Sequence, residues 1–129
     1  MKLISPTLNI DKIATAKLIE EAVMGLQGKE DPFLILESDE LTYAQILWVG
    51  SGYELEYQSG SIDRHYIAAA TLDANTVIAV LKGYLTAQAA WHQGIRFNTK
   101  VIRDTPNRLG YLLGYFCGKL FGTRKKDSG

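Results

Sequence analysis

The sequence has very few residues that bind metals or form disulfides. It contains a single cysteine, Cys117, and only two histidines, His65 and His92. One cysteine cannot form an internal disulfide bond, and so small a set cannot supply the ligands of a typical zinc site. A lone cysteine in an apolar stretch is more typical of a small core residue than of a reactive thiol. We therefore expect no metal and no cofactor, and a reducing location, the cytoplasm.

The sequence also lacks an excess of either charge and lacks long hydrophobic runs. Lys and Arg number 14, and Asp and Glu number 14, whereas nucleic-acid binders usually carry a basic surplus that neutralises phosphates. We therefore expect no nucleic-acid partner, although residues 124–126 (Arg-Lys-Lys) are basic. No stretch approaches the roughly 20 apolar residues of a membrane span. Residues 1–10 have one Lys and no apolar run, so they do not resemble a signal peptide.

Motifs that carry known chemistry are missing as well. No glycine-rich phosphate cradle, HExxH zinc motif or GxSxG nucleophile motif occurs. Gly50-Ser51-Gly52 is typical of a hairpin turn, in which glycines allow positive φ. The sequence therefore favours a protein that is not an enzyme, and it names no catalytic residue.

The composition is that of an ordinary globular domain. The chain has 129 residues, of which 47% are hydrophobic and 22% charged. A chain of this length fits one domain, and it buries roughly two-thirds of its unfolded surface. We predict a single α+β domain over residues 1–129.

Two segments show helical periodicity. The first spans residues 11–26, with Asp11 as a candidate N-cap and apolar residues at helical spacing. The second spans residues 74–91, with Asp73 as its N-cap and Gly94 as its end. His92 would then lie at the negative end of this helix, where a protonated imidazole is favoured.

Four short segments between these helices predict strands, at residues 33–37, 41–49, 53–58 and 64–69. Short turns separate them, which favours an antiparallel meander because parallel connections need a dozen or more residues. Within residues 53–58, Tyr53, Leu55 and Tyr57 alternate with Glu54, Glu56 and Gln58. We therefore predict a four- or five-stranded antiparallel sheet, with the helices packed on the face that bears the two tyrosines. Residues 95–102 fit either a fifth strand or an extended link.

The C-terminal segment has an unusual glycine pattern. Residues 109–122 are largely apolar, and Gly110, Gly114, Gly118 and Gly122 recur every four residues. In a helix they would form one smooth stripe, and each interior glycine would cost about 1 kcal/mol relative to Ala. Three explanations remain open: close packing within the chain, a homodimer through paired helices, or docking to a partner helix or a membrane surface, where the basic, flexible tail at 123–129 would meet anionic lipid.

Polar residues that could form a site gather in the middle of the chain. They are Glu54, Glu56, Asp63, Arg64 and His65, and we take them with Trp48 as candidate binding residues. Paired carboxylates can perform acid–base chemistry when burial raises one pKa. On a half-exposed strand, however, alternating polar residues are normally solvated. A lone histidine is more often a structural hydrogen-bonding group than a base. Trp48 fits either a core residue or a binding anchor near the hairpin tip.

The same region resembles a known family. Residues 41–45 (LTYAQ) and 53–66 (YELEYQSGSIDRHY), with Trp91, resemble the central hairpin of small bacterial immunity proteins of the Imm1-like group. In that group a strand with a Leu-Glu-Tyr core leads through a Gly turn to a His-Tyr pair and then to a helix ending near a Trp. The resemblance covers residues 33–91, and the glycine-rich segment departs from it. It implies a non-enzymatic protein that blocks a toxin with acidic or aromatic groups.

Three hypotheses for the function follow. The first is a protein-binding domain, toxin-neutralising or otherwise, that uses the outer face of the meander and its tyrosines. The second is a small enzyme or ligand-binding domain with a pocket between sheet and helix, where Glu54, Glu56 and His65 converge. The third is a dimeric module built on the glycine-rich helix. A closed pocket in which His65 faces a carboxylate would favour the enzyme.

Overall fold

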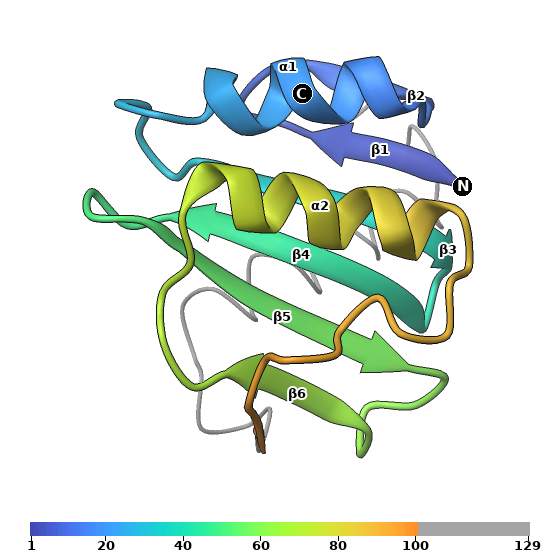
Figure 1. Cartoon of the computed structure of the whole chain (residues 1–129). Helices are drawn as coiled ribbons and strands as arrows, with labels where there is room; N and C mark the ends of the chain where they lie inside the picture. Colours follow the sequence, from blue (N-terminus) through green and yellow to red (C-terminus); the bar gives the residue numbers. More distant parts are fainter. Residues whose placement is uncertain (101–129) are drawn as a thin grey trace, which may run out of the picture. The chain divides into compact units, whose positions relative to one another are not determined.

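A seven-stranded antiparallel sheet forms the framework, in the order β2-β1-β3-β4-β5-β6-β7, in a computed structural model that describes residues 1–100. Two helices complete the α+β fold (Figure 1). The elements are β1 (Lys2–Ser5), β2 (Ile10–Ile13), α1 (Ala16–Gly25), β3 (Phe33–Asp39), β4 (Thr42–Trp48), β5 (Tyr53–Ser59), β6 (His65–Ala68), α2 (Ala74–Leu85) and β7 (Phe97–Thr99).

The predicted meander is confirmed, since β3, β4, β5 and β6 are consecutive antiparallel neighbours. The sheet has more strands than the four or five predicted. β7 pairs with β6 and fits the strand alternative for residues 95–102 as far as Thr99. The hairpin of β1 and β2 was missed, because residues 11–13 of β2 had been included in the predicted first helix. β1 also pairs with β3, more than 25 residues further along the chain, with Leu3 opposite Leu36.

The first helix begins later than predicted. Asp11 lies in strand β2, where its carboxylate forms an ion pair with Lys2 at 2.9 Å. The N-cap is Thr15, whose side-chain oxygen accepts a hydrogen bond from the backbone N–H of Leu18 at 3.1 Å. Thr is a good N-cap because its hydroxyl satisfies a backbone donor of the first turn. The helix predicted for residues 11–26 therefore wrongly included residues of strand β2.

The second helix starts as predicted and ends earlier. Asp73 accepts a hydrogen bond from the backbone N–H of Thr76 at 2.8 Å, which confirms it as the N-cap. The helix ends at Leu85 rather than at residue 91, and Ala87 takes a left-handed conformation with φ of 56°. The chain turns back there, so His92 lies outside the helix, and the prediction that it sits at the helix end was wrong.

Both helices pack on one face of the sheet, which we call the core face (Figure 1). It carries Tyr53, Leu55 and Tyr57, as predicted, and buried residues of the neighbouring strands such as Leu34 and Ile46. The side chains that alternate with these point to the opposite face. The predicted distribution of the β5 side chains over two faces is therefore confirmed.

Residues Met1–Thr99 form one compact unit. Several predictions fall on residues outside the described range: the glycine stripe at 109–122, Cys117 and the basic tail. They remain predictions, as does the extent of the single domain. Within the described residues, neither helix has the length and apolar character needed to span a bilayer.

Candidate functional site

The opposite face of the sheet carries a hydrogen-bonded group of polar side chains from β4, β5 and β6. Gln58 of β5 lies directly opposite His65 of β6, and Tyr43 of β4 lies on the other side of Gln58. Glu56 lies two residues before Gln58 and so projects from the same face. The strand register therefore brings together side chains that are separated by up to 22 residues in sequence.

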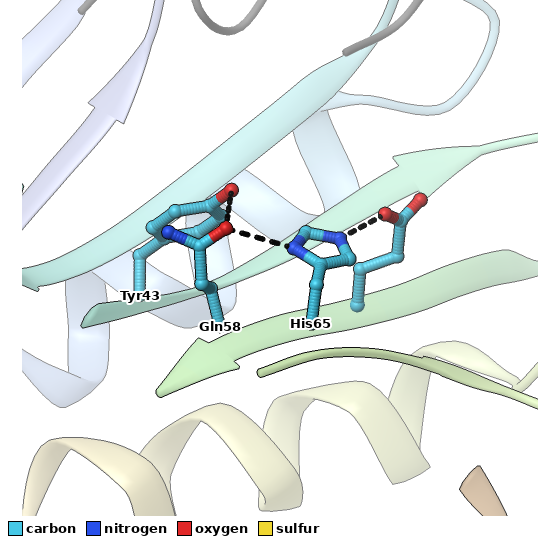
Figure 2. Close-up of polar contacts among 4 residues, drawn as sticks. Tyr43, Gln58 and His65 are labelled. Carbon is cyan, nitrogen blue, oxygen red and sulfur yellow. Dashed lines mark hydrogen bonds and ion pairs between the residues drawn. The ribbon is translucent and has the colours of Figure 1, made fainter. Parts of the chain in front are cut away.

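His65 is held at both ring nitrogens. Its Nε2 lies 2.7 Å from Oε1 of Glu56, and its Nδ1 lies 3.1 Å from Oε1 of Gln58. Figure 2 shows the imidazole ring of His65 beside the amide of Gln58, with the Tyr43 hydroxyl nearby. His65 is only 1% exposed and Glu56 only 4% exposed. A buried charged or polar side chain normally needs such partners, because desolvation is otherwise costly.

The amide of Gln58 determines which histidine nitrogen carries a hydrogen. Its Nε2 donates to the backbone carbonyl of Leu41 at 3.2 Å, so its Oε1 faces His65 and can only accept. The Nδ1 of His65 must therefore be the donor. At Nε2, one shared proton then joins the ring to Glu56, either as imidazolium with carboxylate or as neutral imidazole with carboxylic acid.

This arrangement is suited to structure rather than to proton transfer with a substrate. A general base needs a nitrogen within reach of the substrate proton, and both nitrogens of His65 are occupied by side chains of the protein. Neither of the two cavities described below is lined by His65. The enzyme hypothesis expected a carboxylate facing His65, and Glu56 provides one. Both ring nitrogens of His65, however, are already occupied and are not accessible to a substrate.

Burial of this group differs from the sequence-based expectation. Glu56 and Gln58 are buried rather than solvated, and Glu54 is half-buried. Burial also raises the pKa of Tyr43, and the neighbouring Glu56 carboxylate raises it further, so its phenol stays protonated. Alternation correctly identified the face but could not show that it is buried.

The remaining candidate residues do not converge with His65. Trp48 lies opposite Tyr53 in the register, on the core face, and its ring packs edge-on against Tyr53 at a centroid distance of 5.1 Å. Asp63 and Arg64 are exposed in the turn between β5 and β6. The predicted set is therefore divided between the two faces and the turn, and it does not form one site.

A second group of side chains, which we call the aromatic cluster, lies on the core face where β5 ends and β6 begins. Tyr57 is at its centre: its ring stacks on Tyr66 at 4.8 Å and meets Trp91 and Phe97 edge-on at 5.0 and 4.9 Å. The cluster comprises Tyr57, Tyr66, Tyr84, Trp91, His92 and Phe97. Edge-on and offset-stacked rings are favourable geometries, so these rings hold one another in place.

Gly83 allows Trp91 to join this cluster. A Cβ atom at position 83 would lie 3.1 Å from the Cβ of Trp91, closer than ordinary packing. The backbone N–H of Gln88 donates to the carbonyl of Gly83 at 3.0 Å and fixes the returning chain against α2. The Trp91 ring then packs edge-on against Tyr84 at 5.0 Å. Gly83 therefore allows the segment that carries Trp91 to pack closely against α2.

A cavity of about 350 Å³ opens beside the cluster. Its lining residues are Thr42, Tyr57, Gln58, Ser59, Arg64, Tyr66, Tyr84, Trp91 and His92. Burial, and to a smaller degree the Asp39 carboxylate, raise the pKa of Tyr84 to about 12, so this phenol is a neutral donor at physiological pH. A second hollow, of about 530 Å³, lies between α2 and residues 88–95 and is also bordered by Trp91.

Two polar groups at the cavity are not used within the described residues. Arg64 makes no ion pair in that part of the chain. The Nδ1 of His92 is buried there without a hydrogen-bond partner. Together with the rings, these groups could hold a flat or apolar group that carries a hydrogen-bond acceptor.

Sequence reasoning did not identify the aromatic cluster as a site. Tyr57 was assigned to the core face of its strand, Tyr66 was mentioned only within the segment that resembles immunity proteins, and Trp91 was assigned to a helix that had already ended. The available signal was Gly83 inside a predicted helix, since an interior glycine requires a packing reason. The described residues contain no group of three or more His, Cys, Asp or Glu side chains that could hold a metal ion.

Comparisons with known proteins give no relative. No family model matches the chain, and neither a curated protein nor a solved structure matches it. The functional argument therefore depends on the geometry of the described residues and on the sequence itself.

Proposed function

We propose that this chain is a non-enzymatic protein-binding domain whose contact surface is the aromatic cluster together with the turn between β5 and β6. The observation that carries the proposal is a set of mutually packed, partly exposed rings around a hollow, beside Arg64, which forms no ion pair within the part of the chain that the structure describes. His65 and the Glu56 carboxyl group, which could have performed catalysis, are instead hydrogen-bonded to each other.

The residue types at this surface support the proposal. Tyr, Trp and Arg contribute most of the binding energy at protein interfaces, because they combine a large contact area with a polar group. Tyr57 and Trp91 are already held by ring contacts, so little side-chain entropy would be lost on binding. Ile62, in the turn between β5 and β6, is 48% exposed and adds an apolar side chain to that turn.

Toxin neutralisation is the specific form of binding that we propose. The residues on which the resemblance to immunity proteins rests include Tyr57, Tyr66 and Trp91, and these three lie within the aromatic cluster. A rigid group of rings beside an arginine is suited to covering a polar cleft of another protein. The bound state would block access to that cleft without any reaction.

Site-specific photo-crosslinking in the native host tests the binding surface. A benzophenone amino acid is placed at Ile62, beside the cluster, or at Lys17 on α1 as the control. We expect one discrete adduct with a second protein from position 62 and none from position 17. Equal or absent adducts at both positions would refute the proposed surface. Co-expression with the protein encoded next to this chain then shows whether the partner is toxic and whether its toxicity is relieved.

A small-molecule-binding domain is the second candidate, and the position of the cavity favours it. The cavity lies between the end of β5, the start of β6 and the last turn of α2. Its volume is within the usual range for ligand sites. The corresponding hypothesis from the sequence was a pocket between sheet and helix where Glu54, Glu56 and His65 converge, and these three residues do not line this cavity. A metabolite that raises the melting temperature of the wild type, but not of Trp91→Ala, would favour this candidate.

A further inference from the structure

Arg64 stands where the aromatic cavity meets the turn between β5 and β6. Its backbone N–H donates to Ser61 at 3.1 Å, and its carbonyl accepts from Ser59 at 3.0 Å, so the backbone is fixed by the turn. Its side chain is exposed and lines the cavity. Within residues 1–100 its guanidinium has no ion-pair partner, so it provides a site for an anion.

The walls of the cavity determine what can accompany that anion. Tyr57, Tyr84 and Trp91 line the cavity with aromatic side chains, and Thr42 and Ser59 line it with side chains that carry hydroxyl groups. Rings of this kind accept an aromatic or large aliphatic group through stacking and apolar contact. The cavity therefore combines aromatic rings, polar side chains and one cationic group, the guanidinium of Arg64.

We infer that the cavity binds an acidic peptide segment of a protein partner, in which a carboxylate side chain follows an aromatic residue. The aromatic side chain would lie in the cavity against Tyr57, Tyr84 and Trp91, and the carboxylate would pair with Arg64. This inference rests on the proposed protein-binding function and specifies the chemistry of the partner.

The charge of the lining residues distinguishes an acidic peptide from an organic cation, which is the other class of ligand that aromatic cavities bind. A cage of rings can also hold an organic cation through cation–π attraction. Among the described residues that line this cavity, no Asp or Glu is present, and Arg64 would repel a cation. Asp39 acts on Tyr84 but is not part of the lining. The balance of charge at the cavity therefore favours a carboxylate.

Two matched dipeptides test the inference. In the full chain carrying Trp48→Phe, Trp91 is the remaining tryptophan and reports on the cavity by fluorescence. The probes are acetyl-Phe-Glu-amide and acetyl-Phe-Gln-amide, which differ only in charge. We expect the acidic peptide to bind about three- to fivefold more tightly, as for an exposed ion pair, and the difference to shrink as salt is added.

The variants assign this preference to one side chain. Arg64→Gln should abolish the difference between the two peptides, whereas Lys17→Gln, which removes the same charge from α1, should preserve it. If Trp48→Phe disturbs the fold, amide shift changes of the wild type during the same titrations give the same comparison. Equal binding of both peptides, or a preference that survives Arg64→Gln, would overturn the inference.

Two further results separate the alternatives. Phenylacetate that binds as tightly as the acidic dipeptide, with the same dependence on Arg64, would indicate a free aromatic acid and would refute the peptide. Crosslinking from position 62 does not depend on these probes. A partner captured there while the dipeptides show no charge preference would preserve the proposed function and reject only the acidic segment.

Discussion

The side-chain amide of Gln58 sets the protonation of His65 through a contact of 3.1 Å between Oε1 and Nδ1. The opposite end of that amide donates to the carbonyl of Leu41, so the oxygen cannot be exchanged for the nitrogen without losing two hydrogen bonds. A glutamine thus fixes the imidazole in one orientation, with Glu56 at its other nitrogen. The first two predictions follow from this relationship.

We predict that the Nδ1 atom of His65 carries a hydrogen at neutral pH. A long-range ¹H–¹⁵N correlation spectrum of the imidazole ring measures this directly. In Gln58→Leu the acceptor is lost, and the Nδ1–H signal should broaden through exchange with water. The internal comparison is His92, whose ring nitrogens lie outside this group. A spectrum in which only Nε2 of His65 is protonated would contradict the proposed hydrogen bonding.

We predict that Glu56 and His65 are energetically coupled. Removing one partner of a buried pair leaves the other unsatisfied, so Glu56→Leu and His65→Phe should each lower the free energy of unfolding by about 3–5 kcal/mol. The double variant leaves neither group unpaired, so its loss should be smaller than the sum of the two. Urea denaturation of the four proteins measures the coupling, which we expect at about 1–3 kcal/mol. Additive losses would show that the pair is not coupled.

Tyr53 connects the sheet to the end of the first helix. Its hydroxyl donates to the carbonyl of Val23 at 2.7 Å and accepts from Gln27 at 3.2 Å. Tyr53→Phe leaves this carbonyl near the helix end without that donor, and we expect a loss of about 1–2 kcal/mol. Chemical denaturation measures it. Gln27→Ala serves as the control, because it removes only the second, partly exposed hydrogen bond and should cost less.

Gly83 and Gly25 provide a matched pair for testing the packing of Trp91. Ala is favoured over Gly within a helix by about 1 kcal/mol. A Cβ at position 25 would make an ordinary contact of 3.4 Å with Leu8, whereas one at position 83 would be 3.1 Å from Trp91. Gly25→Ala should therefore stabilise the protein, and Gly83→Ala should gain less or lose. The emission of Trp91 should change only in Gly83→Ala, and equal stabilisation without that change would contradict the close approach.

Tyr84 should contribute to the loss of stability at alkaline pH. Burial raises its pKa in the folded protein to about 12, from an ordinary value of 10.0. The unfolded chain therefore loses this proton first, so the stability contributed by the neutral phenol is complete below pH 10 and disappears as pH rises towards 12. The free energy of unfolding of Tyr84→Phe should fall less steeply over that interval than that of the wild type. Parallel slopes would contradict this contribution.

Short-range patterns predicted much of the sheet and the start of one helix. The alternation of residues 53–58 places Tyr53, Leu55 and Tyr57 on the core face, and Asp73 caps α2 as its position implies. These features depend on the geometry of a strand or a helical turn, so neighbouring residues are sufficient to specify them. The pairing of β1 with β3 was not predictable in this way, because these strands are distant in sequence.

The candidate site, like the fold, was predictable from the sequence only in part. Residue type and spacing alone identified Glu56, Arg64 and His65 as polar residues of interest, on two consecutive strands of the predicted meander. Only the tertiary structure showed that His65 is bonded to Glu56 and Gln58, while Arg64 lines an aromatic cavity with Trp91. The physical reason is that a strand repeat determines the face of a side chain, whereas its burial and partners depend on strand register and chain reversal. At Ala87 one left-handed residue redirects the chain and returns Trp91 to Gly83.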